Sequence, residues 1–221
     1  MDPLEAARAA VHAHVPDAAW AILTGSVLGP RRTPGSDLDI VVMRTTEPGY
    51  RHSLHFAGWP VELFVHTPQR LAGFLEHEHA ARKPSTHRML AHGVTILGDP
   101  GDLPARCATA LAAGPPPLTG PERERLRYGL TDLLDDLRHA TDPGEHTVIA
   151  ATLWTETART ALLTAGCWVS HGKWLLRDLR DWNPHFADRW LTARNDPGQL
   201  TALTTAVLEQ AGGPLFDGYR A

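Results

Sequence analysis

Two aspartates two positions apart, Asp37 and Asp39, are the residues of this chain best suited to chemistry, and they stand at the start of an apolar run over residues 38–43. On a β-strand, residues i and i+2 share a face and lie roughly 6.5 to 7 Å apart. Carboxylates placed side by side repel unless a cation lies between them, and oxygen ligands suit a hard ion such as Mg²⁺. The spacing therefore predicts a divalent metal site.

A third carboxylate, Glu62, interrupts the apolar run over residues 61–65, which reads Val-Glu-Leu-Phe-Val. It has two interpretations at this stage. It could complete the metal ligand set with Asp37 and Asp39, or it could be the solvent-facing residue of an edge strand.

A turn suited to phosphate precedes the aspartates. Gly25-Ser26 ends the apolar run over residues 18–23. Glycine lets a backbone approach a phosphate closely, and the N-terminus of a following short helix presents free N–H groups. The chain has no GxxxxGK[ST] sequence, so this turn is not a P-loop.

The surrounding pattern predicts an α/β half followed by a helical half. Gly-Pro-Pro-Pro at residues 114–117 is the strongest break in the chain, and strand patterns stop before it. We expect domains over residues 1–102 and 103–221. The expected strands are 18–23, 38–43, 61–65 and 94–97, and the expected helices are 4–14, 67–79, 103–113, 121–139, 145–166, 173–181, 184–194 and 199–210.

Composition narrows the classes of protein. The chain has 221 residues, 43% of them hydrophobic, and no apolar stretch near the roughly 18 residues that a membrane span requires. The first residues show no basic region followed by an apolar run, so we expect no secretory leader and a cytoplasmic protein with Cys107 and Cys167 as reduced thiols. The net charge of −4 and the lack of a long basic run disfavour a long nucleic acid as partner.

The acidic excess lies mainly after residue 100 and leaves a choice open. The helical half carries several acids beside Trp154. They could bind a cationic substrate, with the indole stacking on a sugar ring, or they could form the solvated faces of two helices. These acids are Asp132, Asp135, Asp136, Glu145 and Glu156.

Taken together, Gly25-Ser26, the sequence Asp37-Leu38-Asp39-Ile40-Val41-Val42 and an acid in a later strand resemble the DNA polymerase β-type nucleotidyltransferase superfamily. The resemblance covers about residues 18–66 and is nearest to small bacterial aminoglycoside nucleotidyltransferases. It implies an α+β fold, with an N-terminal mixed-sheet catalytic domain and a C-terminal all-helical bundle. It also implies that Asp37, Asp39 and Glu62 are the catalytic ligands of two Mg²⁺ ions. Gly25, Ser26, Ser36 and Arg32 would bind the nucleotide, unless Arg32 is simply exposed.

A narrower likeness extends into the helical half. Arg159, Gly166 and Lys173 stand in the order that the antibiotic-modifying enzymes show, although His171-Gly172 separates Ser170 from the lysine. The likeness implies that Lys173 reaches the nucleotide phosphates. The alternative is an ordinary solvated lysine.

The implied activity is Mg²⁺-dependent transfer of a nucleoside monophosphate, AMP from ATP, onto a hydroxyl of a small molecule such as an aminoglycoside. Pyrophosphate would leave and Glu62 would be the base. The expected partners are a nucleoside triphosphate and a small acceptor, without a membrane, and the oligomeric state stays open. The alternatives are an antitoxin-like enzyme that modifies a partner protein with AMP, a nucleotide-binding module without turnover, and an RNA-tailing enzyme. The helical half favours the small acceptor.

Overall fold

The computed structural model describes residues 1–46 and 48–220, and the chain divides into two compact units, Met1–Ala113 and Gly114–Ala221. The first unit contains one mixed sheet with helices, and the described part of the second unit is helical, so the expected α+β fold is confirmed. The boundary between the two units falls later in the sequence than the expected residue 102. Helix α4 (Leu103–Ala113) packs on α3 (Ser85–His92) and buries Cys107 in the first unit's core, so it belongs to that unit and not to the second.

The sheet of the first unit has five strands in the order β3-β4-β2-β1-β5. β2 and β4 are parallel, whereas the other neighbours are antiparallel. The four expected strands are present as β1, β2, β4 and β5. The strands are β1 (Ala18–Thr24), β2 (Leu38–Arg44), β3 (Tyr50–Phe56), β4 (Trp59–His66) and β5 (Val94–Leu97).

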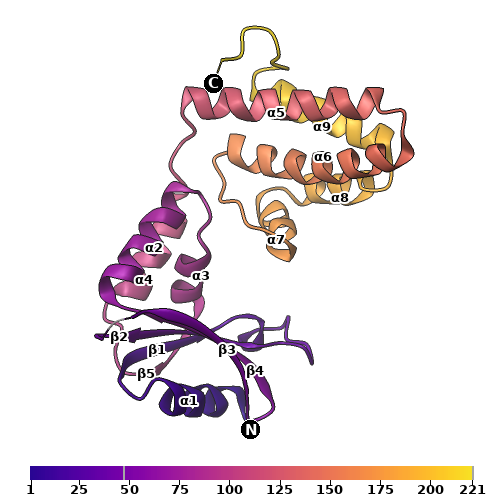
Figure 1. Cartoon of the computed structure of the whole chain (residues 1–221). Helices are drawn as coiled ribbons and strands as arrows, with labels where there is room; N and C mark the ends of the chain where they lie inside the picture. Colours follow the sequence, from indigo (N-terminus) through magenta and orange to yellow (C-terminus); the bar gives the residue numbers. More distant parts are fainter. Residues whose placement is uncertain (47, 221) are drawn as a thin grey trace. The chain divides into compact units, whose positions relative to one another are not determined.

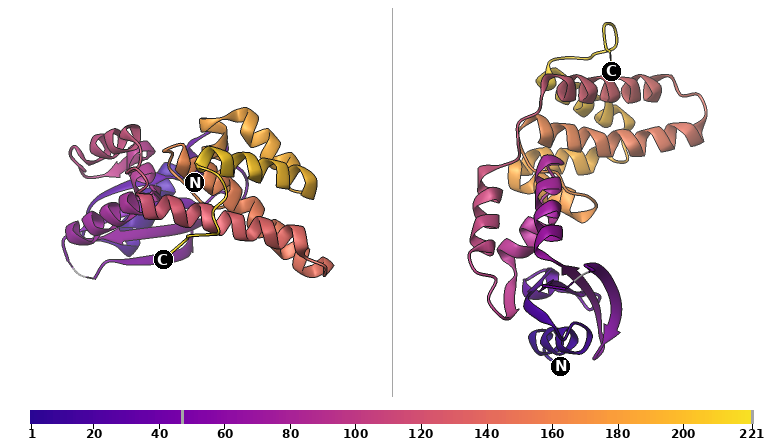
Figure 2. Two further views of the ribbon diagram at one scale, coloured as in Figure 1. Left: turned by 90° about the horizontal axis from the view of Figure 1, so that it is seen from above. Right: turned by 60° about the vertical axis from the view of Figure 1, so that its left-hand side comes forward.

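Helices cover both faces of this sheet (Figure 1). Helix α1 (Pro3–His14) lies on one face, and α2 (Pro68–Ala80), α3 and α4 lie on the other, as the right-hand view in Figure 2 also shows. Strand alternation produces the two cores. Leu23, Ile40 and Leu63 pack toward α1, and Ile22 and Val41 join the core that α2 to α4 cover.

Helix α1 forms because its sequence supplies both a start and an apolar stripe. The Asp2 side chain accepts a hydrogen bond from the Leu4 N–H, and Pro3 occupies the first turn, where no hydrogen-bond donor is needed. The stripe that faces the sheet is small, with three alanines and Val11 buried. The helix can therefore approach the strands closely.

Two elements of the first unit were not expected from the sequence. β3 reads Tyr-Arg-His-Ser-Leu-His-Phe, and it is an edge strand with no fully buried residue, so it lacks the apolar run that marks the other strands. Helix α3 is only 8 residues long. Both elements depend on their neighbours, because isolated segments this short do not hold their structure in water.

The second unit packs its helices around a separate core. Helix α5 begins with a capping box in which Thr119 and Glu122 satisfy each other's backbone N–H groups. Its helices are α5 (Gly120–His139), α6 (Pro143–Thr164), α7 (Lys173–Trp182), α8 (Pro184–Ala193) and α9 (Pro197–Ala211). In the part of the chain that the structure describes, none of the helices combines the length and the apolar character needed to cross a bilayer.

Candidate metal and nucleotide site

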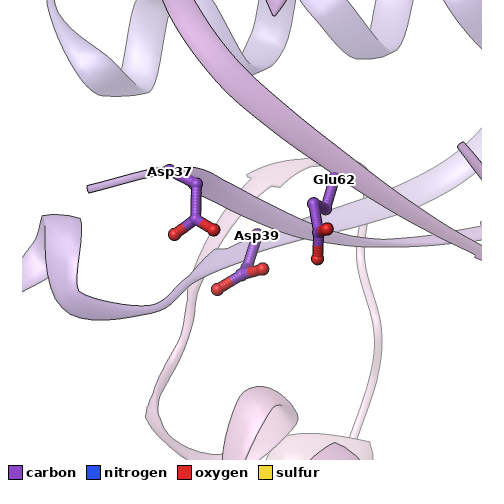
Figure 3. Close-up of side chains that lie close together, drawn as sticks. All are labelled: Asp37, Asp39 and Glu62. Carbon is purple, nitrogen blue, oxygen red and sulfur yellow. The ribbon is translucent and has the colours of Figure 1, made fainter. Parts of the chain in front are cut away.

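The three predicted carboxylates come together at one end of the sheet (Figure 3). Asp39 on β2 pairs in parallel register with Glu62 on β4, and Asp37 directly precedes β2. One oxygen of each lies within 4.8 Å of an oxygen of both others, and all three residues are half-buried. Over residues 1–46 and 48–220, this is the one group of three or more His, Cys, Asp or Glu side chains arranged to share a metal ion.

The turn at Gly25 lies against this cluster because of strand pairing. Thr24, the last residue of β1, is opposite Asp39 in the antiparallel register. Gly25 has a φ of +99°, and a Cβ on it would stand 2.8 Å from Oδ2 of Asp39. The backbone angle favours glycine here, and a Cβ would also require the Asp39 carboxylate to shift. A short 3₁₀ helix, η1 (Ser26–Leu28), follows as the sequence predicted.

Two serines join the two ends of the loop between β1 and β2. The Ser26 and Ser36 hydroxyls are 2.9 Å apart, and the Ser36 hydroxyl accepts a hydrogen bond from the Thr33 N–H at 2.9 Å. Ser36 is only 4% exposed. Its observed contacts therefore hold the loop, and Gly25, just before η1, is the residue that lies against the carboxylates.

Arg32 lies on the same loop, with its guanidinium 5.0 Å from the centre of the Trp59 ring. The residue is exposed, and together with Ser36 and Trp59 it lines a shallow hollow at this edge of the sheet. The cation is therefore near the loop that carries Ser26, and it has one observed partner, the indole.

The structure adds two residues that the sequence analysis missed. Arg51 of β3 forms an ion pair with Glu62, with Nη2 and Oε2 2.5 Å apart, and the Ser53 hydroxyl donates to the other carboxylate oxygen at 3.4 Å. Ser53 is directly opposite Glu62 in the antiparallel pairing of β3 with β4. Glu62 is thus not an unpaired, solvent-facing side chain of an edge strand. The alternation of Tyr50, Leu54 and Phe56 with polar residues was the only sequence signal for this strand.

Lys173 and Arg159 belong to the second unit. Lys173 is exposed and is the first residue of α7, after Gly172, whose φ is +55°. Arg159 on α6 forms an ion pair with Glu156 at 3.2 Å. The role implied for Lys173 at the nucleotide phosphates stays a prediction.

The acids and the indole of the helical half have identifiable surroundings. Asp132, Asp135 and Asp136 are exposed on α5, and Asp135 is paired with Arg138 at 3.1 Å. Trp154 does not present a free face to a sugar. Its ring stacks on Trp190 with centroids 3.8 Å apart, and each indole N–H donates to the other residue's carbonyl at 2.7 Å. The Arg194 guanidinium lies 5.3 Å from the centre of the Trp154 ring. With these neighbours, the Trp154 ring serves core packing.

The cysteines do not resemble nucleophiles. Burial raises the pKa of the Cys107 thiol to about 11 and also raises the pKa of the Cys167 thiol. A thiol must ionise to attack, so both are inert near neutral pH.

The donor set fits a hard divalent cation. Carboxylate oxygens on opposite sides of a bound Mg²⁺ would be about 4.1 Å apart, twice its usual bond length. The observed limit of 4.8 Å is close enough for a small rotation of one side chain to close the difference. Such a set, next to a glycine turn that admits a phosphate, can bind a metal-nucleotide complex.

Comparison with known proteins finds no family for this chain, but it does find a similar solved structure. No protein-family model matches the chain, and no curated protein matches its sequence. Among solved structures, the chain is similar to a nucleotidyltransferase-like protein from Exiguobacterium sibiricum 255-15, with 14% sequence identity and a TM-score of 0.47. The similarity covers 94% of this chain and 72% of that one. At this level it does not carry a function across.

Proposed function

We propose that this protein is a divalent-metal-dependent nucleotidyltransferase that moves a nucleoside monophosphate from a nucleoside triphosphate to a hydroxyl of a small molecule. The observation that carries the proposal is the cluster of Asp37, Asp39 and Glu62 beside the Gly25-Ser26 turn. Carboxylates and a phosphate-admitting turn in contact are what transfer of a phosphorus group needs.

The residues of the first unit have distinct tasks in this reaction. Gly25 leaves room for the β- and γ-phosphates, and the backbone at Ser26 can donate to them. Glu62 would accept the proton of the acceptor hydroxyl, a role that its position on the side of the cluster away from the turn supports. Arg51 supplies positive charge on that same side.

Asp37, Asp39 and Glu62 would hold the metal ions. Bound there, the ions would neutralise phosphate charge, lower the pKa of the acceptor hydroxyl and stabilise the leaving pyrophosphate. The resemblance described above favours two Mg²⁺ ions, ATP as donor and an aminoglycoside-like acceptor. It also assigns Lys173, Ser36 and Arg32 to the nucleotide phosphates.

Pyrophosphate release tests the proposal. The full chain is incubated with Mg²⁺ and labelled ATP, GTP, CTP or UTP against a panel of hydroxylated small molecules that includes aminoglycosides. We expect release with at least one pair of nucleotide and acceptor. Asp37→Asn and Asp39→Asn should each lower the rate by at least 100-fold, because each removes one charged metal ligand.

Glu76→Gln is the matched control, because Glu76 is an exposed acid of α2 outside the cluster. Its rate should equal that of the unmodified chain. Label that passes to a protein partner and not to a small molecule would favour the AMP-modifying alternative. Absence of any transfer, together with absence of Mn²⁺ binding at Asp37 and Asp39, would refute the proposed function.

A further inference from the structure

A cavity of about 290 Å³ lies between the sheet and helices α2 and α3. Its floor is the sheet face that carries Val41, Phe64 and His66, and Arg51 closes one side. Arg70 and Phe74 of α2 form the opposite wall. The volume is at the lower end of the range for ligand pockets and suits a single ring with its substituents.

Strand alternation puts this cavity on the same face as the metal ligands. Val41 is two residues after Asp39 on β2, and Phe64 is two residues after Glu62 on β4. Residues at this spacing share a face and are roughly 6.5 to 7 Å apart. A ligand in the cavity could therefore present a hydroxyl to Glu62.

The strand order also determines on which side of the carboxylates the cavity lies, relative to the Gly25-Ser26 turn. Gly25-Ser26 follows β1, whereas the cavity lies over β2 and β4 and extends toward the edge strand β3. In an in-line displacement, the attacking oxygen and the leaving oxygen lie on opposite sides of the phosphorus. With pyrophosphate on the Gly25-Ser26 side, the acceptor must enter from the side of β4.

The lining favours a flat, negatively charged group. Two guanidinium groups rest on aromatic rings there, Arg51 at 4.8 Å from the centre of Phe64 and Arg70 at 5.3 Å from that of Phe74. Glu78 is the one acid that lines the cavity, and its carboxylate accepts from the Thr86 N–H and hydroxyl at 2.7 to 3.0 Å. Arg51 is already paired with Glu62, so Arg70 is the cation that the lining offers to a ligand carboxylate.

Two further features mark the cavity as a ligand site. Phe74 is 42% exposed, so part of its ring surface is left for a ligand to cover. His66 is 5% exposed, and its Nδ1 has no hydrogen-bond partner among residues 1–46 and 48–220. Aromatic faces, guanidinium groups and an unused imidazole nitrogen suit an arene that carries a carboxylate.

We propose that this cavity is the acceptor site, and that the acceptor is a hydroxylated single-ring carboxylate and not a polycation. The inference rests on the proposed function and narrows its acceptor class. The acceptor oxygen forms a bond to the α-phosphorus of the nucleoside triphosphate, and the bond from that phosphorus to the bridging oxygen breaks. Pyrophosphate leaves with that bond's electron pair, and the hydroxyl proton passes to Glu62.

Binding of three matched phenols tests the charge preference without any turnover. The probes are 4-hydroxybenzoate, 4-hydroxybenzamide and 4-hydroxybenzylamine, titrated against the full chain by saturation-transfer NMR. We expect the carboxylate to bind at least fivefold more tightly than the amide, and the amine to bind least. Arg70→Gln should weaken the carboxylate about tenfold and leave the amide within twofold, whereas Phe74→Ala should weaken both.

Arg106→Gln is the control, because Arg106 is an exposed cation of α4 that does not line this cavity. It should leave all three affinities unchanged. Equal or tighter binding of the amine would overturn the proposal. So would an Arg106→Gln effect as large as that of Arg70→Gln, displacement of the carboxylate by adenosine, or no saturation transfer from any probe.

Relaxation by Mn²⁺ tests separately whether the probe binds near the carboxylates. Bound 4-hydroxybenzoate should show proton relaxation by Mn²⁺ in the unmodified chain and lose it in Asp39→Asn. If Mn²⁺ binds at the carboxylates but does not relax the bound probe, the cavity assignment fails and the proposed function stands. If Mn²⁺ does not bind the unmodified chain and no pair of nucleotide and acceptor releases pyrophosphate, the proposed function fails whatever the probes do.

Discussion

Without metal, replacement of Asp39 by asparagine should make the protein more stable than the unmodified chain. With metal bound, the same replacement should make it less stable than the unmodified chain. Asp39 has two acidic neighbours within 4.8 Å, Asp37 and Glu62. Two like charges at about 4 Å repel by about 1 kcal/mol in a water-like dielectric. Arg51 lies 2.5 Å from Glu62 and offsets the repulsion between Glu62 and Asp39, so the repulsion between Asp37 and Asp39 is the one that the replacement removes. We therefore expect Asp39→Asn to raise the free energy of unfolding by about 1 kcal/mol without metal.

Bound metal reverses the order of stability of Asp39→Asn and the unmodified chain. At a free Mg²⁺ concentration of 100 times its Kd, binding stabilises the folded state by about 2.7 kcal/mol. Asp39→Asn forfeits most of that gain, so it should then be the less stable protein by about 1.5 kcal/mol. Asparagine keeps the size of the side chain, so packing changes little between the two proteins.

Calorimetric unfolding with and without Mg²⁺ measures both differences. One kcal/mol corresponds to a shift of about 4 °C for a unit of this size. Glu76→Gln should follow the unmodified chain under both conditions. The reasoning is refuted if Asp39→Asn is clearly less stable without metal, or if Mg²⁺ raises its transition as much as that of the unmodified chain.

Three further outcomes follow from other contacts. Gly25→Ala should abolish pyrophosphate release and cost about 1 to 3 kcal/mol of stability, because a Cβ is strained at this backbone angle and would displace the Asp39 carboxylate. Gly29→Ala, with open space around it, should leave activity and stability unchanged. Burial, with a smaller contribution from a nearby arginine, lowers the pKa of His66 to about 4 from an ordinary 6.5. The unfolded chain then binds more protons between these values, so stability should fall by about 3 kcal/mol as pH drops from 6.5 to 4. Urea unfolding of His66→Gln should lack that part of the loss, and an unchanged pH profile would contradict the burial argument. Trp190→Ala should cost about 3 to 5 kcal/mol by opening a cavity in the second unit's core, while Mn²⁺ binding at the first unit is retained.

The elements that the sequence missed share a physical property. β3 and α3 carry few apolar residues and gain their stability from the strand and helices beside them. Hydrophobic periodicity reports burial, and an edge strand with polar residues on both faces is hardly buried. The helices of the second unit, which bury wide apolar stripes, were predicted within a few residues of their observed ends.

The sequence also did not predict to which unit α4 belongs. The Gly-Pro-Pro-Pro break at residues 114–117 marked where the chain changes character, and the two units divide there. The helix before the break has no strand pattern and looks like the helices after it. Only its packing against α3, with Cys107 buried, gives it to the first unit.

Asp37 and Asp39 illustrate what the sequence by itself determined. Residues two apart on a strand share a face whatever surrounds them, so their proximity is a local property of the backbone. The position of Glu62 beside Asp39 depends on the parallel register of β2 and β4, and that of Arg51 on the pairing of β3 with β4. Register is a long-range property, set by which faces the helices bury. The paired carboxylates could thus be found in the sequence, whereas the ion pair at Glu62 and the arginine-lined cavity exist only once the sheet has formed.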